Sequence, residues 1–439
     1  MQNLAEVKLW GKRVGALAHD PTTGLSTFEF APEWIDGGVE VAPLHMPLGP
    51  AKYQFPALNR ETYRGLPAVF ADTLPDDFGN AVIDAWLARQ GRDPGSFTAL
   101  ERLLYTGTRG MGALEYAPAM QRDSPRAEQL ELAALVGMAQ QILDQRAQTA
   151  AVICGDEADD RAMSTLFQVG TSAGGARAKA LVAVSADRSR IRSGQAEAPE
   201  GYEHFLLKFD GVEENKVNSE VFGDPKGFGR MEYAYYLMAK DAGLNMSYSE
   251  LLVDGPRAHF MTRRFDRDGN RKRHYVSLCA MDHADYKRPG SYSYEQVLAV
   301  ARQLRLPRRD AVEIFRRMVF NIVARNHDDH SKNLGFILDA PGAPWRLAPA
   351  FDVAYSYKKN SPWVNAHQLS LNGKRDDFVR DDLLAVAALI GNFRQDALEI
   401  IEQVVAVVAR WPEYARHAEV FEPLAKEIHD NLRLYLKGA

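Results

Sequence analysis

A short polar segment carries the side chains best suited to chemistry. Residues 325–333 read Arg-Asn-His-Asp-Asp-His-Ser-Lys-Asn, and Asp352 follows after a short apolar stretch. Kinases use a carboxylate to accept the proton of the substrate hydroxyl, and an amide and a second carboxylate to hold Mg²⁺ on the nucleotide phosphates. The segment offers carboxylates, a lysine and Asn333 in one loop, and Asp352 adds a further carboxylate. This order of groups indicates a phosphoryl-transfer site.

The residues on either side of this segment predict elements that would position it. Apolar side chains within residues 309–324 recur at the three-and-four spacing of an amphipathic helix. They are Ala311, Ile314, Phe315, Met318, Val319 and Ile322. Residues 334–338 predict a short strand, Pro341-Gly342 a turn, and residues 345–351 a return strand. We therefore expect a hairpin that brings Asp352 back to the polar loop.

Two other interpretations of the segment compete with the kinase one. It could be an exposed polar loop between a helix and a strand, since such loops are common. It could also bind a catalytic metal through His327, Asp328 and His330, as in a phosphohydrolase. The first does not explain why a hairpin returns Asp352 to the same end. The second needs a further dense cluster of His and Asp, and none stands out, so we favour kinase chemistry.

A loop of small residues lies upstream. Thr171 to Lys179 falls between expected strands at 164–170 and 181–184 and contains Gly174-Gly175. Glycines allow backbone N–H groups to approach phosphate oxygens closely. The loop matches neither the Walker A pattern nor the protein-kinase glycine pattern, and a Gly-Gly pair is often only a turn. By itself the loop is a weak indication of phosphate binding.

A single lysine ends the next expected strand. Residues 202–210 are largely apolar, and Lys208 stands near their end. A lysine on such a strand is costly to bury unless its charge has a partner. ATP phosphates or Glu232, at the start of an expected helix over 233–243, could be that partner. The alternative is an edge strand whose lysine faces water.

Together these segments resemble the HipA family of serine/threonine kinase toxins. The resemblance rests on the loop at 172–179, the run at 326–333 and Phe351-Asp352. Residues 65–76 resemble the family's Phe-x-Asp-x-Leu-Pro-Asp motif, and residues 264–267 (Arg-Phe-Asp-Arg) resemble its hinge segment. The resemblance covers essentially the whole chain.

This resemblance implies a role for each matching residue. The catalytic base falls on Asp328, the Mg²⁺ ligands on Asn333 and Asp352, and an autophosphorylated serine on Ser172. The expected ATP-binding residues are Gly174, Gly175, Ala176, Arg177, Ala178, Lys179, Lys208, Arg263, Arg264, Phe265, His330, Lys332, Asn333 and Asp352. ATP and Mg²⁺ are the implied cofactors.

The resemblance also implies an α+β fold of protein-kinase-like, bilobal form, with an extra N-terminal α/β subdomain and an all-helical C-lobe. We place the N-terminal subdomain at residues 1–120, the kinase N-lobe with its phosphate-binding loop at 121–262, and the C-lobe with its catalytic loop at 263–439. Short strands with Gly and Pro turns should open the first part. Expected helices lie at 76–90, 96–105 and 381–410.

Composition agrees with this interpretation. A chain of 439 residues with 46% hydrophobic content is long enough for two or three domains with their own cores. The net charge of −5 argues against a surface that binds nucleic acid along its whole extent. Only two cysteines, Cys154 and Cys279, are present, which indicates a reducing compartment. With no signal-peptide pattern and no stretch of membrane-spanning length, we expect a cytoplasmic protein without membrane contact.

Two classes of function follow. The first is an ATP-dependent serine/threonine protein kinase that acts as the toxin of a type II toxin–antitoxin pair. The resemblance implies an aminoacyl-tRNA synthetase or another translation factor as its substrate, and contact with DNA only through a HipB-like DNA-binding antitoxin. The second is a catalytically silent, kinase-like corepressor, and a small-molecule phosphotransferase is a third option. Lys208, Asp328, Asn333 and Asp352 are all present, which favours the enzyme.

Overall fold

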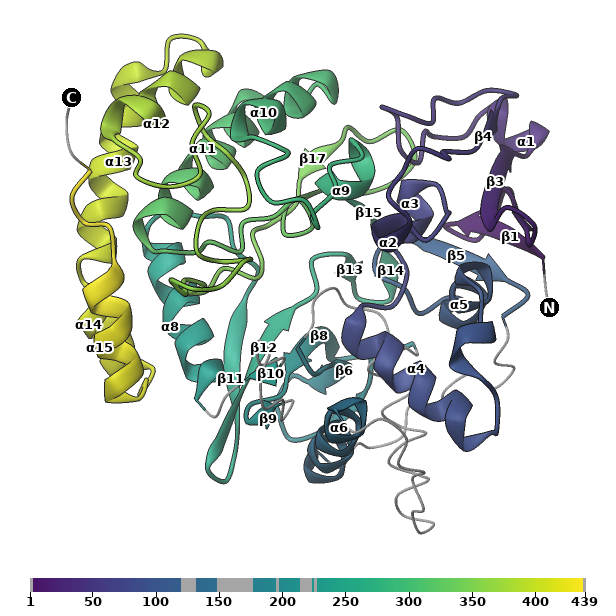
Figure 1. Cartoon of the computed structure of the whole chain (residues 1–439), viewed down its shortest axis with the longest axis horizontal. Coiled ribbons are helices and arrows are strands. Elements are labelled where there is room, and N and C mark those ends of the chain that lie inside the picture. The colour runs from purple at the N-terminus through teal and green to yellow at the C-terminus, as the bar shows by residue number, and fades with distance from the viewer. Residues whose placement is uncertain are drawn as a thin grey trace. The chain divides into compact units, whose positions relative to one another are not determined.

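The computed structural model describes the chain in two compact units. It covers residues 3–119, 132–147, 177–194, 197–213, 223–224 and 227–436. The first unit consists of Met1–Glu40, Leu48–Gly229 and Glu250–His274, and the second of Val41–Pro47, Arg230–Ser249 and Tyr275–Ala439. Figure 1 labels many of the elements of both units. No helix in the described part of the chain is long and apolar enough to cross a membrane.

The first unit opens with a five-stranded antiparallel sheet. Its strand order is β4-β3-β2-β1-β5. The strands are β1 (Leu4–Leu9), β2 (Lys12–Asp20), β3 (Leu25–Phe30), β4 (Lys52–Tyr53) and β5 (Leu114–Ala117). In β1 the alternate residues Ala5, Val7 and Leu9 are fully buried, as expected of a strand with one face on the core. The short strands expected at the start of the chain are confirmed.

Helices of the first unit follow this sheet. They are α1 (Pro32–Ile35), α2 (Arg60–Tyr63), α3 (Ala68–Ala71), α4 (Asp77–Arg89), η1 (Pro94–Ser96), α5 (Ala99–Thr106) and α6 (Leu132–Ala147). The side chain of Asp76 accepts the Gly79 N–H and caps α4, while Thr98 and Glu101 form a capping box at α5. These caps explain why the helices expected at 76–90 and 96–105 form where they do.

A second sheet of the first unit packs against α4 and α6. Its order is β11-β12-β8-β6-β7. The strands are β6 (Lys179–Ser185), β7 (Ile191–Ser193), β8 (Tyr202–Lys208), β11 (Ser249–Asp254) and β12 (Arg257–Arg263); the short pairs β9 (Val212–Glu213) with β10 (Gly223–Asp224) and β13 (Arg267–Asp268) with β14 (Arg271–Lys272) lie outside it. Phe78, Leu135, Val182 and Phe205 belong to one buried cluster that joins these helices and strands. One core thus spans the expected N-terminal subdomain and the expected N-lobe.

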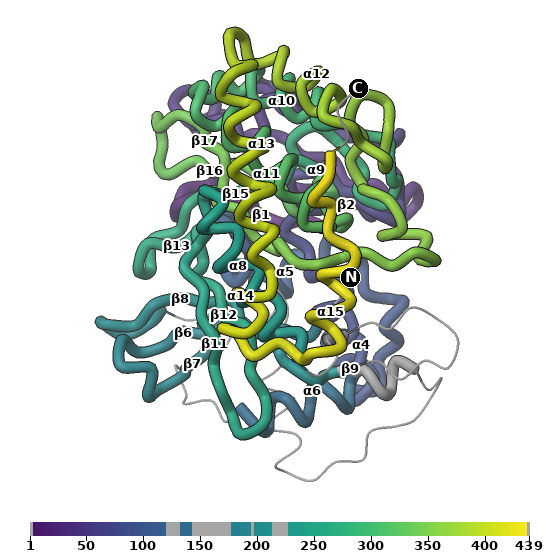
Figure 2. Tube along the Cα trace, turned by 90° about the vertical axis from the view of Figure 1, so that its left-hand side faces the viewer, coloured from purple at the N-terminus to yellow at the C-terminus, as the bar shows by residue number. Residues whose placement is uncertain are grey.

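The second unit is mostly helical. Its elements are most of α8 (Phe228–Asp241), β15 (His274–Ser277), α9 (Leu278–Met281), α10 (Tyr294–Gln303), α11 (Arg308–Val323), β16 (Gly335–Leu338), β17 (Arg346–Leu347), α12 (Arg380–Ala387), η2 (Ala388–Ile390), α13 (Arg394–Val408), α14 (Trp411–His417) and α15 (Glu422–Asn431). Helix α11 buries Ile314, Phe315, Met318, Val319 and Ile322, which confirms the helix expected at 309–324. Figure 2 shows α13 running alongside α11, and the two helices are in contact.

The expectation of an all-helical C-lobe is wrong. Strands β15, β16 and β17 form a three-stranded sheet in the second unit. All four residues of β16 are buried, because the sheet packs inside the unit rather than at its surface. The helix expected over 381–410 is also interrupted. Gly391 and Asn392 adopt φ values of 65° and 44°, a left-handed conformation that ends a helix.

Candidate active site

The polar loop begins where α11 ends. Ala324 closes the helix, and Arg325 takes the left-handed conformation with φ 57°. The Asn326 N–H then donates to the Asn321 carbonyl at 2.9 Å, and the Asn326 amide donates to the Asn321 side-chain oxygen at 2.9 Å. Left-handed residues commonly terminate helices because the next N–H can satisfy a helical carbonyl. The loop therefore leaves the rigid helix at a defined angle.

Asp328 and Asn333 are held by the same loop. The Asn333 side-chain N–H donates to the Asp328 carbonyl at 2.9 Å, and the Asn333 backbone N–H donates to the His330 carbonyl at 2.9 Å. The side chain of Asp328 is 46% exposed, so solvent or a substrate can reach its carboxylate. Since the amide nitrogen of Asn333 is bound to the loop, its amide oxygen is the atom that could coordinate a cation.

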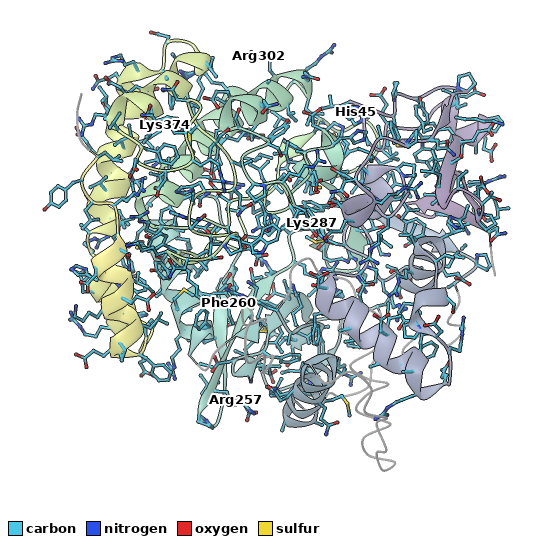
Figure 3. The ribbon with its side chains drawn as sticks, in the orientation of Figure 1. His45, Arg257, Phe260, Lys287, Arg302 and Lys374 are labelled. Carbon is cyan, nitrogen blue, oxygen red and sulfur yellow. The ribbon has the colours of Figure 1, made fainter. Side chains whose placement is uncertain are left out.

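One basic side chain, His330, lies beside Asp328, and a second, Lys332, lies near the same tyrosine as His330. The Nε2 atom of His330 is 3.6 Å from an Asp328 carboxylate oxygen. The ring of His330 lies 5.4 Å from that of Tyr286, and the Lys332 ammonium lies 5.6 Å from the same tyrosine ring. Lys287, labelled in Figure 3, follows Tyr286 in the chain. The structure therefore places the predicted residue His330 next to the predicted base, and Lys332 shares the Tyr286 ring with His330.

Asp329 is an anchor rather than a reactive group. Its carboxylate is almost fully buried and receives hydrogen bonds from the Tyr294 hydroxyl at 2.7 Å and from His367 Nδ1 at 2.9 Å. The backbone N–H groups of Gln368 and Leu369 also donate to it, at 2.8 and 3.4 Å. Burial, together with the Asp329 charge, raises the pKa of Tyr294 well above its usual range. Asp329 thus ties α10 and the segment around 367–369 to the loop.

Asp352 lies beyond the hairpin, as expected, although the return strand is shorter than 345–351. It adopts φ 52°, a left-handed conformation that is uncommon for a residue with a side chain. The preceding residues fix this position. The Ala350 N–H donates to the Asn245 carbonyl at 2.7 Å, and the Phe351 ring meets Tyr275 at 6.2 Å. The backbone at Asp352 is therefore held by contacts on both the chain segment 245–246 and the sheet.

His327 does not have the surroundings of a metal ligand. It is fully buried, its Nδ1 lies 3.1 Å from the Val364 carbonyl, and its ring packs at a tilt against His367, with 4.1 Å between the ring centroids. Burial lowers the pKa of His327 to about 2, with further contributions from His367, Arg325 and Arg433. Within the described residues, no group of three His, Cys, Asp or Glu could hold a metal ion. The phosphohydrolase interpretation thus loses one of its three expected ligands, His327.

In the first unit, Lys208 and Lys179 are cross-strand neighbours. They stand opposite each other on β8 and β6, and both side chains are buried. Opposed residues of an antiparallel pair project to the same face, where like charges repel. The Lys208 ammonium lies 5.8 Å from the ring of Phe260, a residue of β12 labelled in Figure 3. Lys208 thus keeps the position at the end of a buried strand that the sequence predicts.

The sequence did not reveal the partner of Lys179. The Lys179 ammonium lies 2.9 Å from the Asp76 carboxylate, and only 3% of either side chain is exposed. Burial raises the pKa of Asp76 to about 6, while Lys179 opposes that rise. Asp76 also caps α4, with its carboxylate 2.6 Å from the Gly79 N–H. Asp76 ends the Phe-x-Asp-x-Leu-Pro-Asp motif, so its place in that motif was the signal available.

The side chains expected at the hinge form hydrogen bonds and ion pairs with other residues of the first unit. Arg263 is half exposed and donates to Glu203 at 2.9 Å. The guanidinium groups of Arg264 and Arg267 both contact the Asp266 carboxylate at 2.7 Å, and all three side chains are buried. Burial alone would raise the pKa of Asp266, but the two arginines hold it well below its usual range. The role of these residues toward ATP stays a prediction.

The predicted phosphate loop falls only partly on the described residues. Ser172, Gly174, Gly175 and Ala176 lie outside them, as do Thr171 and Cys154. Arg177 lies 5.7 Å from the Phe228 ring, Ala178 is buried, and so is Phe265 of the hinge. The other predicted residues divide between the units: Lys179, Lys208 and the hinge belong to the first, and Asp328, His330, Lys332, Asn333 and Asp352 to the second.

These observations define a class of protein: a mixed α/β fold in which a polar loop follows a buried helix. Residues 171–411 match the family model of the HipA-like C-terminal domain, and residues 5–117 match that of the HipA N-terminal domain. The chain belongs to the HipA family.

A solved structure shows a similar fold. The chain matches one from the Shewanella oneidensis MR-1 toxin–antitoxin system HipA, HipB and its operator DNA complex, with a TM-score of 0.65 and 15% sequence identity. The match covers 97% of this chain and 94% of that one. A second match covers 52% of this chain and 88% of the Helicobacter pylori proinflammatory kinase CtkA, with 15% identity and a TM-score of only 0.33.

Proposed function

We propose that the protein is an ATP-dependent serine/threonine protein kinase and the toxin of a toxin–antitoxin pair. The loop geometry of Asp328 and Asn333 is the observation that supports this most. Kinase catalytic loops carry the base and a metal-binding Asn as Asp-x-x-x-x-Asn, and Asp328 and Asn333 have this spacing. The hydrogen bond from the Asn333 amide to the Asp328 carbonyl holds the two residues in one geometry.

Each residue has a role that suits its surroundings. Asp328 is exposed enough to accept the proton of a substrate hydroxyl, which is the work of a general base. Asn333 and Asp352 offer the hard oxygen atoms that Mg²⁺ prefers, and they would hold it. Lys208 and Lys332 are suited to bind ATP phosphates. Bound ATP would supply the phosphoryl group, and the Mg²⁺ held with it would neutralise negative charge on the phosphates.

The proposed partner is a HipB-like DNA-binding antitoxin. The Shewanella protein was solved with HipB and operator DNA, and its fold extends over nearly the whole of this chain. The net charge of −5 favours contact with DNA through such a partner rather than directly. The proposed substrate is an aminoacyl-tRNA synthetase or another translation factor, and the proposed site of autophosphorylation is Ser172.

A single substitution tests the proposal. Asp328→Ala removes the base but leaves Asn333 and Asp352, so the variant should bind Mg²⁺–ATP with wild-type affinity in calorimetry. Transfer of labelled phosphate from ATP to the protein itself and to lysate proteins should fall by about 100-fold or more. Mass spectrometry of the wild-type protein should place its own phosphate on Ser172.

A matched control is Glu402→Ala, an exposed carboxylate on α13. It should leave both affinity and transfer unchanged. Wild-type protein that binds ATP but labels nothing would contradict the kinase and support the silent corepressor. Full transfer by the Asp328→Ala variant would show that another group is the base.

A further inference from the structure

The segment that follows α15 turns back to the start of the catalytic loop. The Arg433 N–H donates to the Val323 carbonyl at 2.9 Å, at the last residue of α11. The Arg325 Nε donates to the Asn431 carbonyl at 2.8 Å. The last carbonyls of a helix have no partner inside it, so an outside N–H that reaches one stabilises the helix end. The Arg433 N–H therefore caps the helix from which the loop emerges, and Asn431 holds the Arg325 side chain next to it.

Two guanidinium groups meet on one carboxylate at this point. Arg433 contacts Asp376 directly, and Arg325 lies 3.6 Å from the same carboxylate. Only 12% of Arg433 and 15% of Arg325 are exposed. Their guanidinium groups cover the rings of Phe378 and Tyr357 at 5.8 and 4.5 Å. Because two buried like charges repel, the arrangement needs a carboxylate: Asp376 contacts both guanidinium groups, and the exposed Asp377 lies 4.0 Å from Arg433.

Arg325 connects this cluster to the reacting residues. Its carbonyl accepts the Ser356 N–H at 3.1 Å, and its Nη1 lies 3.4 Å from His327 Nε2. Asp328 follows His327 directly. A shift of the Arg325 backbone would thus move the base and the segment that follows Asp352 together.

We infer that Arg433 is a positioning residue for phosphoryl transfer, and that the segment after α15 braces the catalytic loop through Asp376 and Arg325. This inference rests on the proposed function, since it assigns the brace to that reaction. Arg433 need not touch ATP or the substrate for this role. It fixes the backbone from which Asp328 and Asn333 project.

Kinetics and hydrogen exchange test the brace. Arg433→Ala should lower the kcat of phosphoryl transfer by up to about 100-fold, because small misplacements of catalytic groups are costly. The KM for ATP should stay at the wild-type value. Arg433→Lys keeps a cation near Asp376 and should recover part of the rate. Arg416→Ala removes an exposed cation from α14 and should behave as wild type.

A double-mutant cycle identifies the route. If Arg433 acts through Asp376, the effects of Arg433→Ala and Asp376→Asn on kcat should be clearly non-additive. The kcat of the double variant should then be no lower than that of the less active single variant. In the Arg433→Ala variant, the amide hydrogens of Asn326 and Ser356 should exchange faster, while those of β6 and β8 should not change. Additive effects would overturn the route through Asp376.

The possible failures can be told apart. An Arg433→Ala variant with wild-type kcat and wild-type exchange in the loop overturns the inference. So does one that only melts at a lower temperature, with an unchanged kcat for the folded protein. If the wild-type protein transfers no phosphate, the proposed function fails instead. The exchange of Asn326 and Ser356 then still decides whether Arg433 holds the loop.

Discussion

Asp328 and Asp329 are adjacent in the chain but have opposite surroundings. Asp328 is exposed and lies near His330, whereas Asp329 is buried under four hydrogen-bond donors. The loop turns between them, so one carboxylate can react and the other can only hold structure. Spacing along the sequence favours Asp328 as the catalytic base. Only the hydrogen-bond donors from distant segments exclude Asp329 from that role.

A histidine pair near the loop predicts a pH dependence of stability. His283 stacks on His45 at 3.8 Å, and Asp282 accepts hydrogen bonds from His45 at 3.1 Å and from Tyr292 at 2.5 Å. Burial lowers the pKa of His283 to about 4 from 6.5; the charge of His45 adds to this, and that of Asp282 opposes it. Folding therefore favours the neutral ring. The corresponding stability, roughly 3 kcal/mol, is present above pH 6.5 and lost as the pH falls toward 4.

His283→Asn tests this dependence. His283 has φ 54°, a conformation that Asn adopts readily, so the substitution should not strain the backbone. The urea midpoint of the variant should fall less than that of the wild type between about pH 7 and about pH 4.5. His417→Asn, on the exposed end of α14, should keep the wild-type slope. Equal slopes for all three proteins would remove His283 as the cause.

At the scale of elements, the ion pair between Asp76 and Lys179 joins α4 to β6. Asp76→Asn keeps the helix cap but leaves a buried ammonium without its charge partner, which costs about 3–5 kcal/mol. A double variant that combines Asp76→Asn with Lys179→Met removes both charges and should recover most of that loss. Thermal unfolding measures both effects. Asp93→Asn, at the exposed cap of η1, should change stability by no more than about 0.5 kcal/mol.

The same double variant tests the role of Lys179 toward ATP. If Lys179 is only structural, calorimetry should give the variant a wild-type affinity for Mg²⁺–ATP. A large loss of affinity in a stable double variant would confirm the ATP-binding role that the family resemblance implies. Failure of the double variant to recover stability would show that the pair matters for more than its charges.

Local patterns predicted single elements well. The strand expected over 202–210 and the helices expected at 309–324, 76–90 and 96–105 were all readable, because each depends on neighbours in the chain. The sheet that joins β15 to the β16–β17 hairpin was not readable, since β15 comes from a distant segment. The partners of Lys179 and Arg325 were hidden for the same reason.

At the scale of the molecule, the ranges matched by the two family models differ from the ranges of the two compact units. The two family matches cover residues 5–117 and 171–411, yet the first compact unit contains strands from both. Phe78 of the first match and Phe205 of the second lie in one buried cluster. A boundary near residue 120 therefore marks the end of the match to the HipA N-terminal domain. It does not mark the end of a hydrophobic core.

At the scale of the whole chain, Mg²⁺ should stabilise the fold only together with a nucleotide. Asn333 and Asp352 provide only two protein ligands, too few to dehydrate Mg²⁺ without phosphate oxygens. Mg²⁺ alone should therefore leave the melting temperature unchanged. A non-hydrolysable ATP analogue with Mg²⁺, at about 100 times its Kd, should stabilise the fold by about 2.7 kcal/mol. Asp352→Asn should remove the part of this gain that depends on Mg²⁺.

The control is Asp339→Asn, at a carboxylate that pairs with Arg346 at 2.6 Å in the hairpin. It should keep the full response to Mg²⁺ and nucleotide, because Asp339 is not among the proposed ligands. Strong stabilisation of the nucleotide-free protein by Mg²⁺ or Zn²⁺ would instead indicate a metal site complete within the protein. That result would favour the phosphohydrolase, despite the burial of His327, and would require a different role for the Asp328–Asn333 loop.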